Sequence, residues 1–244
     1  MKQSTLLLAA AALLAVSSCS RGPVRPEIDI VTADTLLARN GAECRIEYRF
    51  ATIRNADKSP VLRTIEQANI GYFFGKDIPA ATLQEAIGAS IREIDTTYMP
   101  DQPGIVANHS YEISAESEIT LLDTLLTCTI TRSSYTGGAH GYYGTTYHTY
   151  SLGSGYEITT ADLFTEEQIE RIDRMILKKL CEKYDARNQD ELAARGFFPE
   201  EIGMTENFRL TADSITFCYN PYDIGCYALG DIEVAIGLRE IDMR

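Results

Sequence analysis

The sequence has few basic side chains for its length, and this shortage excludes one large class of partner. Lysine and arginine together number 22 among 244 residues, against 35 aspartates and glutamates, so the formal net charge is −13. Proteins that bind nucleic acids neutralise phosphates with lysine and arginine. We therefore expect no nucleic-acid partner. A cationic protein or peptide, or a neutral glycan, suits the charge better, and acidity that serves only solubility is the simpler alternative.

The sequence also lacks the common catalytic and cofactor motifs. It contains no H-E-x-x-H pair, no Walker phosphate loop, no G-x-S-x-G elbow and no glycine pattern of a dinucleotide-binding turn. The spacing of His109, His140 and His148 matches no familiar metal-ligand pattern. We expect no cofactor, no metal and no catalytic residue, and we favour a binding protein over an enzyme.

Beyond the first nineteen residues, no apolar run approaches the eighteen or so residues that a membrane-spanning helix needs. Residues 1–19 themselves have the form of a signal: Lys2, an apolar run from Leu6 to Val16, and small residues before Cys19. This segment resembles the bacterial lipobox, in which the cysteine is acylated and becomes the first mature residue. An ordinary secretory signal with an incidental cysteine is the alternative.

The lipobox resemblance implies a cell-envelope protein that is attached to a membrane through its N-terminal lipid only. Lys2 is the only charged residue of the signal, so the mature chain has 21 basic and 35 acidic residues and a net charge of −14. Residues 20–22 lack the acidic cluster that some surface-export signals use. We therefore expect the anchored protein to face the periplasm rather than the cell surface.

The rest of the chain alternates between strand-like and helix-like periodicity. Residues 20–34, with three glycine or proline positions and little apolar periodicity, suit a flexible tether. Residues 35–132 contain a period-two strand at 44–50 and helical patterns at 60–75 and 80–98. Residues 133–244 contain further strands around a helix that begins at the Thr165–Gln168 capping box. Because strands and helices come in clusters, we predict a two-layer α+β fold with antiparallel sheets covered by helices.

Five cysteines follow Cys19, an odd number that leaves at least one thiol unpaired within the chain. Cys218 and Cys226 bracket a short, turn-rich segment and are the best candidates for a disulfide. Cys44 and Cys128 alternate with polar neighbours, and Cys181 lies in a helical pattern, so buried thiols are expected at these three positions.

The densest unusual segment is Tyr135–Gly144, which combines four glycines with one histidine and three tyrosines. Glycines allow positive φ angles and close approach, whereas the rings of His140, Tyr142 and Tyr143 offer flat faces with polar tips. This composition favours a ligand-contacting rim. The alternative is a bulged connection between two strands, in which His140 satisfies backbone groups.

Two motifs, in order, resemble a known envelope domain family. This family is shared by the lysozyme-sensing anti-sigma factor RsiV and the accessory region of the peptidoglycan deacetylase PdaC. The first motif is Thr136–Gly141 with Thr145–Tyr147 and, further on, Leu163–Phe164; the second is Phe217–Gly225 with Tyr227–Gly230. The resemblance covers about residues 133–241 and implies a C-terminal RsiV-like domain at 133–244.

The resemblance implies a non-catalytic domain that binds a lysozyme-like muramidase, which is a basic protein, or a peptidoglycan fragment. The ligand-binding residues that we predict are His140, Tyr142, Tyr143 and Tyr222. Unlike RsiV, the sequence shows no sigma-factor-binding segment and no spanning helix, so a signalling role is not expected. Two alternatives remain open: a glycan-directed hydrolase with two carboxylates about 5–9.5 Å apart, and a structural envelope lipoprotein.

Overall fold

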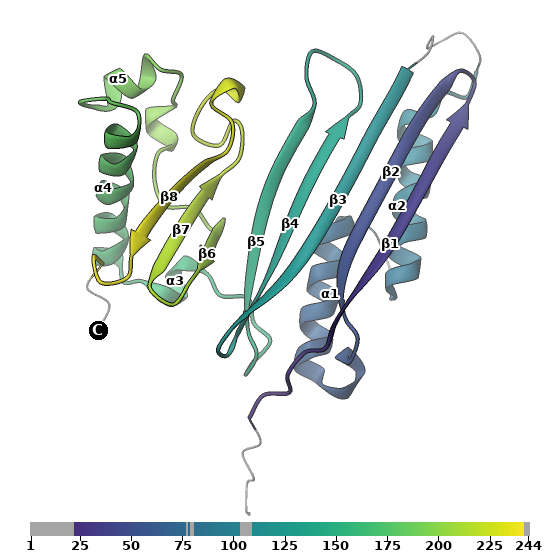
Figure 1. Ribbon diagram of the computed structural model, residues 1–244, viewed down its shortest axis with the longest axis horizontal. Helices are drawn as coiled ribbons and strands as arrows, with labels where there is room; N and C mark the ends of the chain where they lie inside the picture. The colour runs from purple at the N-terminus through teal and green to yellow at the C-terminus, as the bar shows by residue number, and fades with distance from the viewer. Residues whose placement is uncertain (1–21, 77, 79–80, 103–108, 242–244) are drawn as a thin grey trace, which may run out of the picture.

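The chain folds into two β-sheets that stand side by side, each with helices on one face. The computed structural model describes residues 22–76, 78, 81–102 and 109–241 (Figure 1). A five-stranded sheet is followed along the chain by a three-stranded sheet. Helices and strands occur in clusters, which confirms the predicted α+β class.

The first sheet has the strand order β1-β2-β3-β4-β5. All neighbouring strands are antiparallel except β2 and β3, which are parallel. The parallel pair departs from the predicted all-antiparallel arrangement because two helices lie between these strands, and such a crossover returns the chain in the same direction. The strands are β1 (Ile28–Arg39), β2 (Ala42–Ile53), β3 (His109–Leu122), β4 (Leu125–Tyr135) and β5 (Tyr142–Ser151).

The crossover consists of helices α1 (Pro60–Phe74) and α2 (Leu83–Tyr98), which cover one face of this sheet (Figure 1). The Ser59 side chain accepts a hydrogen bond from the backbone N–H of Leu62 at the start of α1, and Pro60 occupies the first turn. Thr82 and Glu85 form a reciprocal capping box at the start of α2. These local signals confirm the two helical patterns that the sequence predicts.

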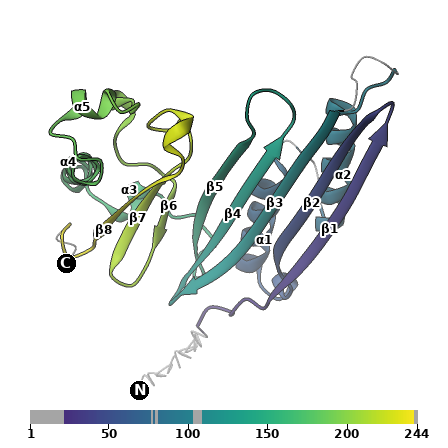
Figure 2. The same ribbon diagram turned by 45° about the horizontal axis from the view of Figure 1, so that its top comes forward.

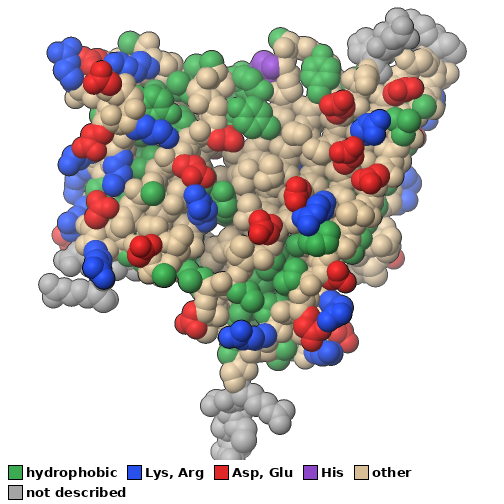
Figure 3. All heavy atoms as spheres, in the orientation of Figure 1, with side chains coloured by type: hydrophobic (Ala, Val, Ile, Leu, Met, Phe, Trp, Pro, Cys, Tyr) green, Lys and Arg blue, Asp and Glu red, His purple; other side chains and the backbone are tan. Residues whose placement is uncertain are grey.

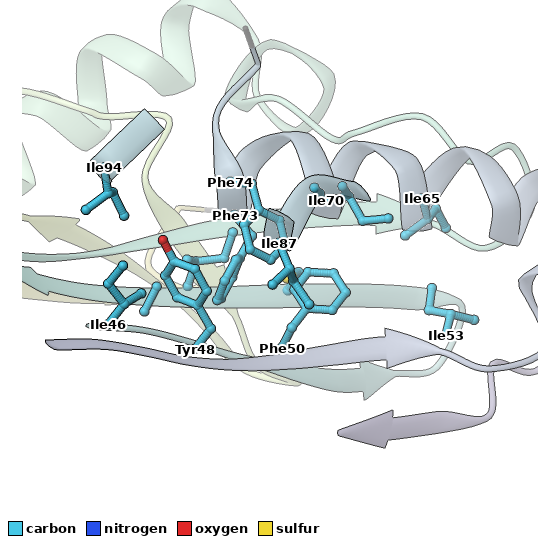
Figure 4. Packing of buried hydrophobic residues seen from close by; sticks show 14 of the residues in the cluster. Ile46, Tyr48, Phe50, Ile53, Ile65, Ile70, Phe73, Phe74, Ile87 and Ile94 are labelled. Carbon is cyan, nitrogen blue, oxygen red and sulfur yellow. The ribbon is translucent and has the colours of Figure 1, made fainter. Parts of the chain in front are cut away.

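The core of this half lies between α1, α2 and the sheet. Alternate residues of β2 point toward the helices, and among them Tyr48 and Phe50 pack against Phe73 and Phe74 (Figure 4). The ring centroids of Phe50 and Phe73 lie 5.1 Å apart in an edge-to-face arrangement. The opposite face of the sheet carries polar side chains, such as Arg45, Glu47 and Arg49, and no helix of the described residues covers it.

The second sheet has the order β6-β7-β8, with every neighbouring pair antiparallel. Helix α4 lies beside it, and Figure 2 looks nearly along the axis of this helix. Ile172, Ile176 and Leu180 of α4 are fully buried against the sheet. The elements are α3 (Thr160–Leu163), α4 (Glu166–Lys183), α5 (Gln189–Ala193), β6 (Phe208–Leu210), β7 (Ser214–Tyr219) and β8 (Ile232–Gly237), with short 3₁₀ turns at Ala56–Lys58, Pro199–Glu201 and Tyr227–Leu229.

The structure corrects the predicted tether, because residues 28–34 belong to β1. This strand pairs with β2 along its whole length through a hairpin whose turn is Asn40–Gly41, both with positive φ. The predicted boundary between residues 132 and 133 falls inside β4, and β5 completes the first sheet. Strand pairing across this point therefore joins the two predicted segments.

The predicted signal, with Cys19 as its lipidation site, lies outside the described residues. Within the described ranges, no helix has both the length and the apolar character that crossing a membrane would require.

Candidate functional site

The glycine-rich segment forms the connection from β4 to β5 and is tightly folded. Gly137 and Gly138 both have positive φ angles, near 95°. A Cβ atom at Gly141 would lie 2.7 Å from the carbonyl oxygen of Ser134, so only glycine fits at this position. The connection thereby holds His140 exposed at the end of the sheet, next to the first residues of β5.

A second connection, between β7 and β8, approaches the first from the other sheet. Its turn begins at Asn220, whose N–H donates to the Asp223 carboxylate over 2.7 Å. Tyr222 follows with a φ of 77°, a conformation that bulky residues rarely adopt, and its side chain is 56% exposed. Such strain at an exposed ring is characteristic of functional sites, because packing alone does not require it.

The two connections meet in a group of four rings, which we call the aromatic cluster: His140, Tyr143, Tyr222 and Tyr227. His140 stacks on Tyr227 with centroids 3.9 Å apart, and Tyr143 meets Tyr227 edge to face at 5.6 Å. In the neutral His140 ring, Nδ1 donates to the Gly141 carbonyl over 2.9 Å, and Nε2 accepts from the Tyr222 hydroxyl over 3.3 Å. Hydrophobic side chains and a histidine gather at this upper edge, between the two sheets (Figure 3).

Two asparagine side chains hold the sheets together beside the cluster. Asn220 Oδ1 accepts from the N–H of Thr145 over 2.7 Å. Asn207 Oδ1 accepts from the N–H of Tyr147 over 3.0 Å, while its Nδ2 donates to the carbonyls of Thr145 and Cys218, each over 2.9 Å. These amides take the place of a neighbouring strand at the edge of β5. The position of the aromatic cluster therefore depends on this asparagine seam, by which we mean Asn207, Asn220 and their bonds to β5.

Carboxylates lie close to the aromatic cluster. Burial, and then the nearby Asp231 and Tyr227, raise the pKa of the Tyr143 hydroxyl. Burial also raises the pKa of Asp231 itself, and the negative charges of Glu233 and Asp223 add to the effect. Ring faces together with mutually repelling carboxylates favour a positively charged group, which would stack on the rings and relieve the repulsion.

The structure brings three of the four predicted binding residues together and separates the fourth. Tyr143 and Tyr142 are consecutive residues of β5, so their side chains point to opposite faces of the sheet. Tyr143 belongs to the aromatic cluster, whereas Tyr142 lies on the helix-covered face and lines a cavity beside α2. The sequence reasoning missed Tyr227, whose stacking on His140 no local pattern reveals.

The predicted disulfide between Cys218 and Cys226 is wrong. All five cysteines in the described part of the chain are free thiols. Cys218 lies on β7 with its Sγ 3.8 Å from Glu233 Oε1, whereas Cys226 Sγ occupies the space over Gly196. Burial and the charge of Glu233 raise the pKa of Cys218 to about 11, so this thiol is a poor nucleophile.

A second polar group, formed by His148, Glu157 and Tyr72, lies on the helix-covered face. His148 Nδ1 is 2.7 Å from Glu157 Oε1, and the Tyr72 hydroxyl donates to Glu157 Oε2 over 2.7 Å. The Tyr72 ring stacks on His148 at 3.6 Å. Burial, the hydrogen bond to Glu157 and its charge raise the pKa of Tyr72 to about 12. These contacts tie α1 to β5 and to the turn after it.

The C-terminal part of the chain is similar to a known protein family. Residues 161–238 match a family model described as "Protein of unknown function (DUF3298)". This part runs from α3 to β8, and so includes Tyr222, Tyr227 and both seam asparagines, but not His140 or Tyr143. No curated protein matches the chain significantly.

The likeness to solved DUF3298 structures extends over both sheets. A member of this family from Bacteroides fragilis is 25% identical, with 89% of this chain and 92% of that chain covered and a TM-score of 0.75. A DUF3298 family protein from Pseudomonas aeruginosa is 15% identical, with 90% and 94% covered and a TM-score of 0.65. The second likeness concerns the fold alone. Residues 161–238 are thus similar to the DUF3298 family, and the chain shares its overall fold with solved DUF3298 proteins.

Proposed function

We propose that this chain is a non-catalytic, lipid-anchored cell-envelope protein that binds a basic, lysozyme-like protein through the aromatic cluster. The observation that carries the proposal is the meeting of His140, Tyr222 and Tyr227 from two connections about eighty residues apart in sequence. Exposed rings beside carboxylates suit arginine and lysine side chains, which stack on aromatic faces and pair with acids. The net charge of the mature chain supports the same class of partner.

Binding of a basic lysozyme to residues 20–244, which contain every described helix and strand, tests the proposal. Titration calorimetry at low and moderate salt should show binding that weakens as salt rises. Tyr227→Ala should weaken binding by about tenfold or more, because interface tyrosines often contribute 2 kcal/mol. Tyr156→Ala is the matched control, since Tyr156 is 78% exposed and lies outside the cluster.

The alternatives predict different outcomes of the same experiment. If peptidoglycan fragments bind and the basic protein does not, the glycan replaces the protein as ligand. If the protein cleaves the glycan, the hydrolase alternative is correct and the non-catalytic proposal is wrong. If neither ligand binds, or if Tyr227→Ala behaves like the native protein, the cluster is not the binding site that we propose.

The lipid anchor is a separate part of the proposal and has its own test. The support for it is the run of small residues before Cys19 after an apolar segment. Metabolic labelling with a fatty acid in a bacterial host should mark the native protein, which should remain in the membrane fraction. Cys19→Ser should abolish both the label and membrane retention. Retention of the label by this variant would contradict lipidation at Cys19.

A further inference from the structure

A cavity of about 300 Å³ lies beside α2 near the glycine-rich connection, at the edge of the sheet where β4 ends and β3 and β5 begin. It is separate from the aromatic cluster, because Tyr142, which lines it, is on the opposite face of β5 from Tyr143. Its volume is at the lower end of the range for small-molecule sites. Its walls are largely aromatic and aliphatic, formed in part by Phe73, Phe74, Ile94, Tyr98 and Tyr142.

The cavity also contains the guanidinium of Arg132, which is partly buried on β4. Its Nη2 donates to the carbonyls of Tyr72 and of Phe73, the latter over 3.0 Å, in the last turn of α1. Nε and Nη1 have no hydrogen-bond partner, and Arg132 has no carboxylate partner, within the described part of the chain. A largely buried arginine is usually paired with an acid, whereas Arg132 is partly buried and bonds only to backbone carbonyls.

The orientation of Arg132 is well defined, because two backbone carbonyls hold one of its nitrogens. Burial lowers the pKa of the guanidinium, although arginine remains charged at any physiological pH. Its remaining donors are Nε–H and the two hydrogens of Nη1, each of which can give a charge-assisted hydrogen bond to a carboxylate oxygen. The cavity therefore provides an oriented positive charge with free donors beside an apolar space.

A carboxylate of the chain also lines the cavity, at its solvent side. Glu93 extends from α2 and is exposed. The Tyr48 hydroxyl, which hydrogen-bonds to Ser90 over 2.8 Å, lines the same cavity, and the charges of Glu93 and Arg132 both act on it. A positive and a negative group thus face one apolar space without forming an ion pair with each other.

We propose that this cavity binds a small amino carboxylate with an apolar side chain, such as a free amino acid. The ligand carboxylate accepts a hydrogen bond from Nη1 of Arg132, its ammonium group faces Glu93, and its side chain packs against Phe73, Phe74 and Ile94. The inference is independent of the protein partner proposed above, because the cavity shares no residue with the aromatic cluster.

Titration of ¹⁵N-labelled residues 20–244, followed by NMR, tests the proposal with defined probes. The probes are leucine and phenylalanine, each enantiomer separately, together with their amides and with 3-phenylpropionate, which lacks the ammonium group. At least one amino acid should shift the amide signals of residues around Arg132 and Glu93. Its amide should bind about tenfold more weakly or worse, because it cannot form the charge-assisted hydrogen bonds.

Two variants show whether the assigned groups are responsible. Arg132→Lys keeps the charge but has a single nitrogen, which cannot both bond to the α1 carbonyls as Nη2 does and serve the ligand as Nη1 does. It should weaken binding of the amino acid and of 3-phenylpropionate alike. Glu93→Gln changes an exposed position, so the fold should persist, and it should weaken the amino acid selectively. Arg45→Gln, on the open face of the sheet, is the control. Absence of binding by every probe, equal binding of acid and amide, or shifts that follow neither variant would overturn the proposal.

Discussion

Gly144 determines how closely β5 can approach the turn after β7. A Cβ atom there would lie 2.8 Å from the Tyr142 hydroxyl and 3.0 Å from Asn220 Oδ1. We expect Gly144→Ala to displace Asn220 from the N–H of Thr145 and to lower the free energy of unfolding by about 1–3 kcal/mol. Urea denaturation measures this. Gly153→Ala is the control, since its Cβ would make only an ordinary contact at 3.6 Å.

A substitution at Tyr222 can separate the backbone strain of its positive φ angle from the role of its ring in binding. Asparagine tolerates a positive φ better than tyrosine does. We expect Tyr222→Asn to keep the free energy of unfolding within about 1 kcal/mol of the native value, while binding of a basic lysozyme is lost. Thermal unfolding and calorimetry measure the two effects. A variant that unfolds readily, or that binds like the native protein, would contradict a functional role for the ring.

Sequence reasoning at the residue scale found only part of the cluster. The combination of glycines, His140 and tyrosines identified the first connection, because such composition is unusual over a few residues. It failed to separate Tyr142 from Tyr143, although period-two alternation in a strand requires that they face opposite sides. Tyr227 could not be found, because its contact with His140 depends on how two distant connections meet.

Substitution of Asn207 tests most directly how the two sheets are joined. Its amide makes three hydrogen bonds, to the backbones of Tyr147, Thr145 and Cys218. Asn207→Asp replaces the donor by a carboxylate oxygen that faces two carbonyls, so we expect a loss of about 2–4 kcal/mol of stability. Hydrogen exchange should show faster exchange at β5 and β6 than at β2. Unchanged protection at β5 would show that the asparagine seam does not join the sheets.

The contact of α1 with β5 should depend on pH through Glu157. Burial raises the pKa of this carboxyl, but the hydrogen bonds from His148 and Tyr72 outweigh burial and lower it below 4.5. A carboxyl whose pKa is lower in the folded than in the unfolded state stabilises the fold at pH values above the unfolded-state pKa. This stabilisation is lost as the pH falls through the folded-state pKa. Glu157→Gln should therefore cost about 1 kcal/mol at pH 7 and progressively less below pH 4.5. Denaturation curves at several pH values measure the difference, and a constant difference would contradict this origin.

At the element scale, capped helices were predictable and edge strands were not. Ser59–Pro60 and the capping boxes at the starts of α2 and α4 are local signals, and the structure confirms α1, α2 and α4. Residues 28–34 of β1 were mistaken for a tether because, in this edge strand, Ile28 and Ile30 are exposed and no residue is fully buried. The Asn40–Gly41 pair was the signal that could have identified it, since this dipeptide is typical of tight hairpins.

At the scale of the whole molecule, only part of the fold was predictable from the sequence. The α+β class followed from clustered elements, but the joining of two sheets through side-chain amides could not be predicted, because asparagines in such a seam have no periodicity.

The open face of the large sheet mixes charges of both signs (Figure 3), as in the pair Arg49–Glu116 at 2.7 Å. In the proposed binding, the negative excess attracts the basic partner at long range, whereas the aromatic cluster acts by contact.

This separation predicts different kinetic effects for distant and local substitutions. Neutralising Glu166, Glu167 and Glu170 on α4, away from the cluster, should slow association with a basic lysozyme about two- to tenfold at low salt and leave dissociation unchanged, because long-range attraction governs encounter. Tyr227→Ala should instead accelerate dissociation. Surface plasmon resonance at about 20 mM and 200 mM salt measures both rates, and the α4 effect should vanish at the higher salt, where the Debye length is shorter. Association rates that are equal at both salt concentrations would show that the acidity of the chain does not attract its partner.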